Sequence, residues 1–212
     1  MKRSKTSKPW WLERHVHDPY VKRAQQEGYR SRAAYKLLGL DEKDHLLRPG
    51  MTVVDLGAAP GGWCQVAAKK LGAKGRVIAI DLLDMVPVPG VEFIRADFAD
   101  TQGWGQVESS LQGHKADLVL SDMAPNLSGV AGVDQARHYG LAELALEFAA
   151  QCLQPDGAFV VKVFQGSGFE AYLRQVKATF RQVAVRKPDA SRDESRENFL
   201  VARGLAKPQV QA

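Results

Sequence analysis

The sequence predicts an α/β fold in which a mostly parallel sheet carries helices on both faces. Three observations predict it. From about residue 50 onward, short apolar runs typical of buried strands alternate with longer segments of helical periodicity. A glycine-rich turn, DLGAAPGGW (residues 55–63), joins the first run to a helix, the place where open α/β sheets bind ligands. Four successive runs end at an aspartate: Asp55, Asp81, Asp97 and Asp122.

The predicted elements follow one another with short connections. Residues 18–40 are helical with an interruption near Gly28, and Asp18 before Pro19 is a typical N-cap. Strands are expected at 51–56, 76–81, 91–97, 117–122 and 157–164, with helices at 60–72, 101–112, 134–153 and 167–180. Two last strands, 182–187 and 198–203, have no helix between them, so we expect an antiparallel pair at one edge.

Composition and length restrict the class of protein. The 212 residues are 45% hydrophobic and 25% charged, as in ordinary globular domains. We expect a basic flexible segment at 1–17, one domain at 18–206 and a loose tail at 207–212. No apolar run has the roughly 18 to 20 residues that a membrane helix needs, and the N-terminus lacks the apolar stretch of a signal peptide. Two distant cysteines, Cys64 and Cys152, predict neither disulfides nor structural zinc, so we expect a cytoplasmic protein, by default a monomer.

Positive charge is concentrated near the N-terminus. Residues 1–36 hold ten Lys and Arg against three acids, a net charge of +7, whereas the other 176 residues carry a net charge of −2. Aromatic residues interleaved with these cations can stack on unpaired bases, which indicates nucleic acid as one candidate partner. Arg30 and Arg32 are expected to matter more for RNA binding than residues 1–8. A solvated helical face is the alternative, and this segment alone does not choose between them.

The acids at the strand ends favour a cationic cofactor. Gly57, Gly61 and Gly62 let backbone approach a ligand closely, although a tight turn alone also uses glycines. Asp81 is placed to accept ribose hydroxyls and Asp97 to accept from an exocyclic amine. An acidic edge suits the sulfonium of S-adenosylmethionine better than the pyrophosphate of NAD, and Pro60 removes a backbone N–H that a diphosphate would use.

A lysine inside an apolar strand predicts paired charges. Lys162 interrupts GAFVVKVF, where an unpaired amine is costly unless it snorkels to the edge. The predicted topology brings Asp122, Glu197 and Lys36 to the same crevice. Two amines and two carboxylates suit methyl transfer to a ribose 2′-hydroxyl. An amine with a lowered pKa takes the proton, the second amine stabilises the alkoxide, and the carboxylates orient both. No residues have metal-ligand spacing, so no metal is predicted.

These motifs together resemble one family. DLGAAPGGW, SDMAPN (121–126), VVKVFQG (160–166) and SRDESRENFLV (191–201) are similar to those of the FtsJ-type ribose 2′-O-methyltransferases, over about residues 8–204. The resemblance implies a class I S-adenosylmethionine-dependent, Rossmann-like fold with strand order 3-2-1-4-5-7-6. It also implies methylation of a uridine 2′-hydroxyl in the A-loop of 23S rRNA within the large ribosomal subunit. The tetrad that it implies is Lys36, Asp122, Lys162 and Glu197, with Lys162 as proton acceptor; its cofactor contacts are Gly61, Trp63, Asp81, Asp97 and Asp122.

Three other functions stay open at this point. A tRNA anticodon-loop methyltransferase of the same family shares the tetrad, because RNA choice depends on surface charge. A ribosome assembly factor without catalysis would not need the complete tetrad. An NAD-dependent oxidoreductase would share the glycine turn but not the lysine in the strand.

Overall fold

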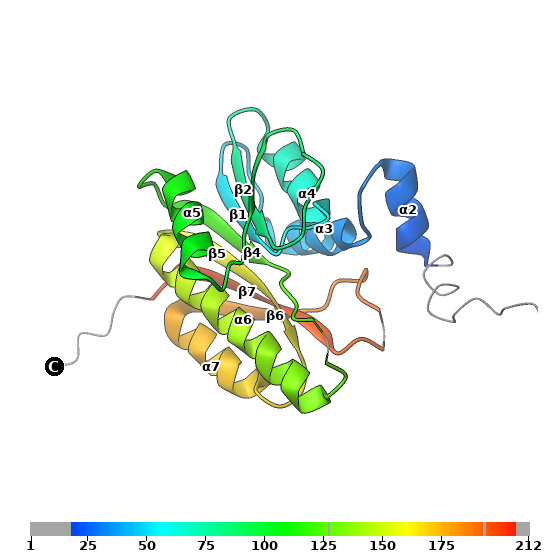
Figure 1. The fold of residues 1–212 in the computed structure, drawn as a ribbon, viewed down its shortest axis with the longest axis vertical. Helices are drawn as coiled ribbons and strands as arrows, with labels where there is room; N and C mark the ends of the chain where they lie inside the picture. Colours follow the sequence, from blue (N-terminus) through cyan, green and yellow to red (C-terminus); the bar gives the residue numbers. More distant parts are fainter. Residues whose placement is uncertain (1–17, 127, 193, 207–212) are drawn as a thin grey trace, which may run out of the picture.

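The computed structural model of the chain describes residues 18–126, 128–192 and 194–206 (Figure 1). The segments expected to be a basic flexible arm, 1–17, and a loose tail, 207–212, lie outside the described residues. The described residues form a seven-stranded sheet in the order β3-β2-β1-β4-β5-β7-β6. This order confirms the class I methyltransferase topology that the resemblance implied.

The sheet is parallel except for one strand. β1 to β5 pair in parallel, whereas β7 runs antiparallel to both β5 and β6. The carboxyl ends of β1 to β5 and the amino end of β7 therefore meet at one edge of the sheet. The strands are β1 (Thr52–Leu56), β2 (Arg76–Asp81), β3 (Val91–Arg95), β4 (Ala116–Ser121), β5 (Leu153–Phe164), β6 (Phe180–Arg186) and β7 (Glu197–Leu205).

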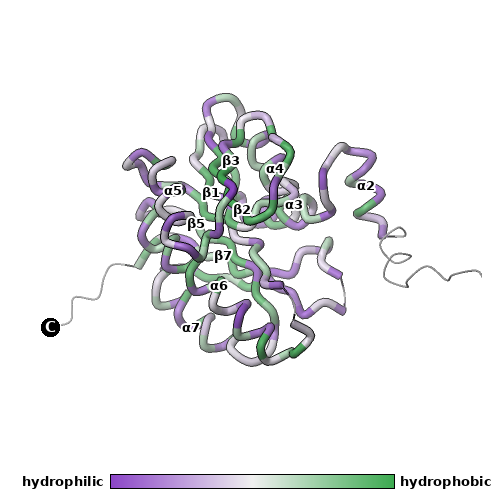
Figure 2. The backbone as a smooth tube through the Cα atoms, viewed as in Figure 1, coloured by the Kyte–Doolittle hydropathy of each residue, from purple (hydrophilic) through white to green (hydrophobic). Residues whose placement is uncertain are grey.

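Helices cover both faces of the sheet, as the sequence predicts (Figure 1). α3 and α4 pack on one face, where Leu37 and Val66 meet Val53 of β1 in one hydrophobic core. α5, α6 and α7 pack on the other, where Phe148 and Val176 meet other strand residues in a second core. Figure 2 shows the most hydrophobic backbone along the strands between these layers. The helices are α2 (Pro19–Glu27), α3 (Ala33–Asp44), α4 (Gly62–Leu71), α5 (Thr101–Leu111), α6 (Ala131–Cys152) and α7 (Phe169–Thr179).

The predicted start of α2 is confirmed in atomic detail. Asp18 Oδ1 accepts a hydrogen bond from Tyr20 N at 3.0 Å, and Pro19 occupies the first helical turn. Gly28 ends the helix in the left-handed conformation, at φ 77°. Among the described residues, no helix combines the length and apolar composition that crossing a bilayer requires.

Several boundaries differ from the expectation by a few residues, and the start of β5 is one of them. β5 begins at Leu153, directly after α6, rather than at residue 157. Leu153 pairs with Ala116 before the register shifts, and residues 154–156 are exposed. Because those exposed residues are polar, they carry no apolar signal for a strand, and only the buried part of β5 is recognisable in the sequence.

Candidate active site

The glycine-rich turn after β1 is closely packed against neighbouring backbone. Gly57 has φ 80°, and a Cβ there would lie 2.9 Å from Met123 Cα, just beyond β4. Gly61 has φ 103°, and a Cβ there would lie 2.7 Å from Met85 Sδ in the loop after β2. The turn therefore needs glycine for its own packing, in addition to any role in ligand approach.

Two of the predicted cofactor-binding acids also organise the strand ends. Asp81 Oδ2 accepts from Ala59 N at 2.9 Å, and its Oδ1 accepts from Leu83 N at 2.8 Å. Asp97 is exposed, and its Oδ1 accepts from Ala99 N at 2.9 Å. A carboxylate oxygen can accept more than one hydrogen bond. Both side chains thus lie at the expected edge with capacity for hydroxyl or amine donors.

Asp55 differs from the other strand-end acids because it is fully buried. Its Oδ2 accepts a hydrogen bond from Cys64 Sγ of α4 at 3.1 Å. Burial raises the pKa of Asp55 to about 7, and the nearby carboxylates of Asp122 and Asp81 add to the rise. Asp55 therefore lies behind the glycine turn and not on the open edge where the sequence pattern had placed it.

Trp63 uses its side chain for packing. Its ring is buried, with its centroid 5.8 Å from that of Phe199 in β7. Its Nε1 donates to the carbonyl oxygen of Ala33, at the start of α3, at 2.8 Å. These contacts join α4 to α3 and β7. Because they engage the Trp63 side chain, its main chain is left to make the predicted cofactor contact.

Lys162 is held below the surface by Asp122. Its side chain is 8% exposed, and Nζ donates to the main-chain oxygen of Asp122 at 2.6 Å. The same Nζ lies 3.0 Å from the Oδ1 atom of the Asp122 carboxylate. The amine is therefore paired inside the fold and does not extend to solvent, as a snorkelling lysine would.

Lys36 and Glu197 form a second pair of opposite charges. Lys36 lies on α3, and its Nζ is 2.7 Å from both carboxylate oxygens of Glu197, the first residue of β7. Both side chains are largely buried, at 15% and 10% exposed. Ser191 Oγ donates to Glu197 Oε1 at 2.9 Å. The Glu197 carboxylate thus has a charged and a neutral partner at once.

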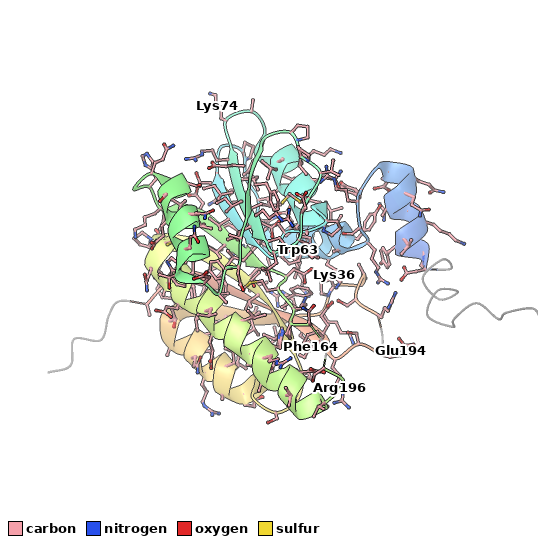
Figure 3. All side chains as sticks on the ribbon, viewed as in Figure 1. Lys36, Trp63, Lys74, Phe164, Glu194 and Arg196 are labelled. Carbon is pink, nitrogen blue, oxygen red and sulfur yellow. The ribbon has the colours of Figure 1, made fainter. Side chains whose placement is uncertain are left out.

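The two pairs lie on the same face of β5 and β7. Phe199 stands directly opposite Lys162 in the antiparallel ladder, and its ring is 5.8 Å from Lys36 Nζ. Glu197 pairs with Phe164, two positions from Lys162, so Lys162 and Glu197 are diagonal neighbours. Figure 3 labels Lys36, Trp63 and Phe164 around this region. The structure brings together the four residues that the sequence grouped.

One buried residue near the site has no counterpart in the sequence analysis. His138 of α6 is 3% exposed, and its ring centroid lies 4.7 Å from that of Phe164. Burial, the largest cause, and the positive charge of nearby Lys162 together lower the pKa of His138 to about 4. The imidazole is therefore neutral at pH 7. A single histidine within a helical pattern gives no sequence signal of this proximity.

The two arginines expected to contact RNA bind within the protein. The Arg30 guanidinium donates to the carbonyl oxygens of Pro60, at 3.2 Å, and Pro87, at 2.7 Å. It thereby holds the glycine turn and the loop after β2 together. Arg32 pairs with the carboxylate of Asp18. Replacing either arginine would first remove these contacts within the protein, so such variants are poor tests of RNA contact.

The described part of the chain contains no candidate metal site. None of its His, Cys, Asp and Glu side chains form a group of three or more that could hold an ion. The polar atoms at the strand ends instead comprise carboxylates, two amines and main-chain groups. These are suited to binding a cation and to moving a proton from a hydroxyl.

Comparison with known proteins agrees with this geometry. The model of the FtsJ-like methyltransferase family matches residues 29–205. A relative from Thiobacillus denitrificans, named ribosomal RNA large subunit methyltransferase E, is 62% identical over 204 residues, which are 95% of this chain and 91% of the relative. A relative of the same name from Azoarcus sp. is 59% identical over 201 residues, 95% of this chain and 98% of the relative.

A solved structure shares both the fold and part of the sequence. The crystal structure of a protein described as a ribosomal RNA methyltransferase of Plasmodium falciparum superposes with a TM-score of 0.75 at 32% identity. The match covers 84% of this chain and 98% of that one. The whole sheet, the glycine turn and all four residues of the two ion pairs lie inside the matched family region. The chain therefore belongs to the FtsJ-like methyltransferase family.

Proposed function

We propose that the protein transfers a methyl group from S-adenosylmethionine to the ribose 2′-hydroxyl of a uridine in the A-loop of 23S rRNA. The observation that carries the proposal is the arrangement of Lys162, Asp122, Lys36 and Glu197. Two buried amines, each held by a carboxylate, face one side of β5 and β7 at the ligand-binding edge of the sheet. The names of the relatives from T. denitrificans and Azoarcus sp. support the large ribosomal subunit as the substrate.

The donor set at the strand ends fits the proposed cofactor. Asp81 and Asp97 follow adjacent parallel strands and keep acceptor capacity for ribose hydroxyls and the adenine amine. Asp122 Oδ1 is buried and has no hydrogen-bond partner among the described residues, although the charge of Lys162 is nearby. When bound, S-adenosylmethionine supplies an electrophilic methyl group on a sulfonium. Main-chain atoms of the turn from Gly57 to Trp63 complete the proposed binding site.

The tetrad performs the proton transfer in this proposal. Lys162 Nζ enters this step as the neutral amine and accepts the proton of the 2′-hydroxyl as the 2′-oxygen forms its bond to the methyl carbon, while the carbon–sulfur bond breaks with its electron pair on sulfur. The ammonium that results pairs with the Asp122 carboxylate. Asp122 fixes the position of the Lys162 amine through both contacts that it makes. Lys36 stabilises the developing negative charge on the 2′-oxygen, and Glu197 orients Lys36.

RNA binding is assigned to the basic N-terminal segment. Residues 1–36 carry a net charge of +7, and the last of their cations is Lys36 itself. A cationic segment that leads into the proposed site attracts the phosphates flanking the target ribose. We propose a cytoplasmic monomer that acts on the large subunit, with no metal in the reaction.

The test is methyl transfer from cofactor labelled in the methyl group. We expect label in 23S rRNA of undermethylated large subunits, and nuclease digestion followed by mass spectrometry should locate it on one uridine ribose. Label on bulk tRNA but not on these subunits would replace the proposal with the tRNA enzyme. Binding of NAD without binding of S-adenosylmethionine, measured by isothermal titration, would contradict it altogether.

A further inference from the structure

The Glu197 carboxylate has a second partner outside the proposed tetrad. Ser191 Oγ donates to Oε1 at 2.9 Å while Lys36 Nζ lies 2.7 Å from both oxygens. Ser191 is 4% exposed and Glu197 is 7% exposed, so water does not compete freely for these positions. A buried carboxylate between a fixed hydroxyl and a lysine has one favoured orientation.

The position of Ser191 is itself set by a turn. Its main-chain N–H donates to the carbonyl oxygen of Pro188 at 2.8 Å. The next turn is closed by Ser195 N, which donates to the carbonyl oxygen of Arg192 at 2.9 Å. These main-chain bonds bring the hydroxyl of Ser191 toward the start of β7, six residues along the chain.

This turn is tied to the helix that carries Lys36. Arg32, the residue before α3, donates to the carbonyl oxygen of Ala190 and pairs with Asp18. Arg192 approaches the same Asp18 carboxylate at 3.5 Å. Because Lys36 lies one helical turn after Arg32, two connections in parallel join α3 to the segment before β7. One connection is the hydrogen bond from Arg32 to Ala190. The other runs from Lys36 through the Glu197 carboxylate to Ser191.

We infer that Ser191 is a positioning residue for methyl transfer. Its hydroxyl fixes the Glu197 carboxylate, which in turn fixes the Lys36 amine where negative charge develops. The inference rests on the proposed function, because Lys36 acts on the reacting oxygen only there. Ser191 itself touches neither reactant. Its effect must therefore be on turnover and must depend on the presence of Glu197.

The first experiment compares two serines of the same segment. In Ser191→Ala we expect kcat to fall about tenfold, with the KM for the ribosomal substrate and the Kd for S-adenosylmethionine unchanged. Ser191→Thr, which keeps the hydroxyl, should restore most of the activity. Ser195→Ala is the matched control, because Ser195 Oγ accepts from the main-chain N–H of Glu197 at 3.2 Å, whereas Ser191 Oγ donates to the Glu197 carboxylate. Its kcat should stay within twofold of the wild type.

Three results would overturn the inference. They are an unchanged kcat in Ser191→Ala, an equal loss in both alanine variants, or no recovery in Ser191→Thr at an unchanged melting temperature. Melting temperatures are measured for every variant. If Ser191→Ala melts below the assay temperature, Ser191→Cys replaces it, because it keeps the volume with a weaker donor and should give an intermediate loss of kcat.

The second experiment separates this inference from the proposed function. In a Glu197→Ala background, Ser191→Ala should cause no further loss of kcat, because the carboxylate through which it acts is gone. If Ser191→Ala and Glu197→Ala instead lower kcat by independent factors that multiply in the double variant, the positioning role is refuted. If Glu197→Ala alone leaves methyl transfer unchanged, the proposed function fails; if Glu197→Ala lowers kcat and Ser191→Ala does not, the inference about Ser191 alone fails.

Discussion

The Lys162 side chain is both charged and buried, and burying a charged amine is costly unless the amine has a partner. Nζ is held by the main chain of Asp122 and lies beside its carboxylate, on a strand whose neighbouring residues are apolar and buried. A protein without a use for this charge would be more stable with an apolar residue here. The retained amine is best explained by proton transfer at the strand ends.

Replacing Lys162 with alanine should abolish turnover without abolishing cofactor binding. A general base contributes roughly 10²- to 10⁴-fold to a rate, so we expect kcat to fall by at least two orders of magnitude. Isothermal titration should give a Kd for S-adenosylmethionine within a few-fold of the wild type. Lys74→Ala is the control, because Lys74 is exposed between α4 and β2, far from the tetrad (Figure 3). Undiminished turnover in Lys162→Ala would exclude the base role.

His138 should make the fold less stable in acid. The unfolded imidazole takes up a proton near its ordinary pKa of 6.5, whereas the buried one does so only near pH 4. Between these values the unfolded state binds more protons, so stability falls as the pH falls. Relative to His138→Leu, the wild type should lose about 2 kcal/mol between pH 7.5 and pH 4.5. Denaturant unfolding of both proteins at the two pH values measures this.

The comparison with the variant is needed because Asp55 acts in the opposite direction. Its pKa of about 7 in the folded state lies above the ordinary 3.8, so protonation of Asp55 favours the folded state in acid. Both proteins contain Asp55, and its contribution cancels in their difference. An equal pH dependence in wild type and His138→Leu would contradict the proposed burial of a neutral imidazole.

At the scale of elements, the site depends on how the first strand turns into its helix. Gly57 combines a positive φ with close contact between the turn and Met123, two residues after the end of β4. The sequence predicted that the glycines of this turn let the backbone lie close to a ligand. The structure shows that neighbouring protein backbone occupies that side of Gly57, which explains the glycine independently of the cofactor.

Gly57→Ala should therefore destabilise the fold, by about 2 to 4 kcal/mol. The left-handed φ adds strain, and a Cβ 2.9 Å from Met123 Cα forces the backbone to shift. Gly105→Ala is the matched control, because Gly105 lies within α5 with no atom near its would-be Cβ. That change should stabilise the fold by about 0.5 to 1 kcal/mol. Melting curves for the two variants should move in opposite directions; a shared direction would contradict this account of the turn.

For the whole molecule, the separation of charge predicts salt-sensitive RNA binding. Each phosphate neutralised on single-stranded RNA contributes about −0.7 to the slope of log K against log salt. Residues 1–8 contain four basic side chains, so deleting them should make the slope shallower by up to about three. Filter binding of an A-loop RNA from 50 to 300 mM salt measures both slopes. An affinity independent of salt would show that the basic segment does not contact phosphates.

The sequence predicted the sheet and the tetrad because both depend on patterns along the chain. Apolar runs, four of them ending in aspartate, located the five parallel strands, and a lysine among valines indicated a paired charge. The contacts of Ser191, Arg30 and His138 were not predictable in this way. Arg30 and His138 contact residues distant in the chain, through a loop and across helix packing. Ser191 contacts Glu197 only six residues away, but through a turn whose conformation no periodic pattern predicts.

β7 lies inside the sheet although it is the last strand in the described part of the chain. During synthesis on a ribosome, one edge of β5 therefore has no hydrogen-bonded neighbour until β7 has been made. The same holds for β6, whose neighbour in the sheet is β7. An unpaired strand edge is prone to pairing with other chains. Because Glu197 opens β7, the four residues of the proposed tetrad can meet only after this strand has been synthesised. The described elements from α2 to β6 are therefore all synthesised before these four side chains can come together.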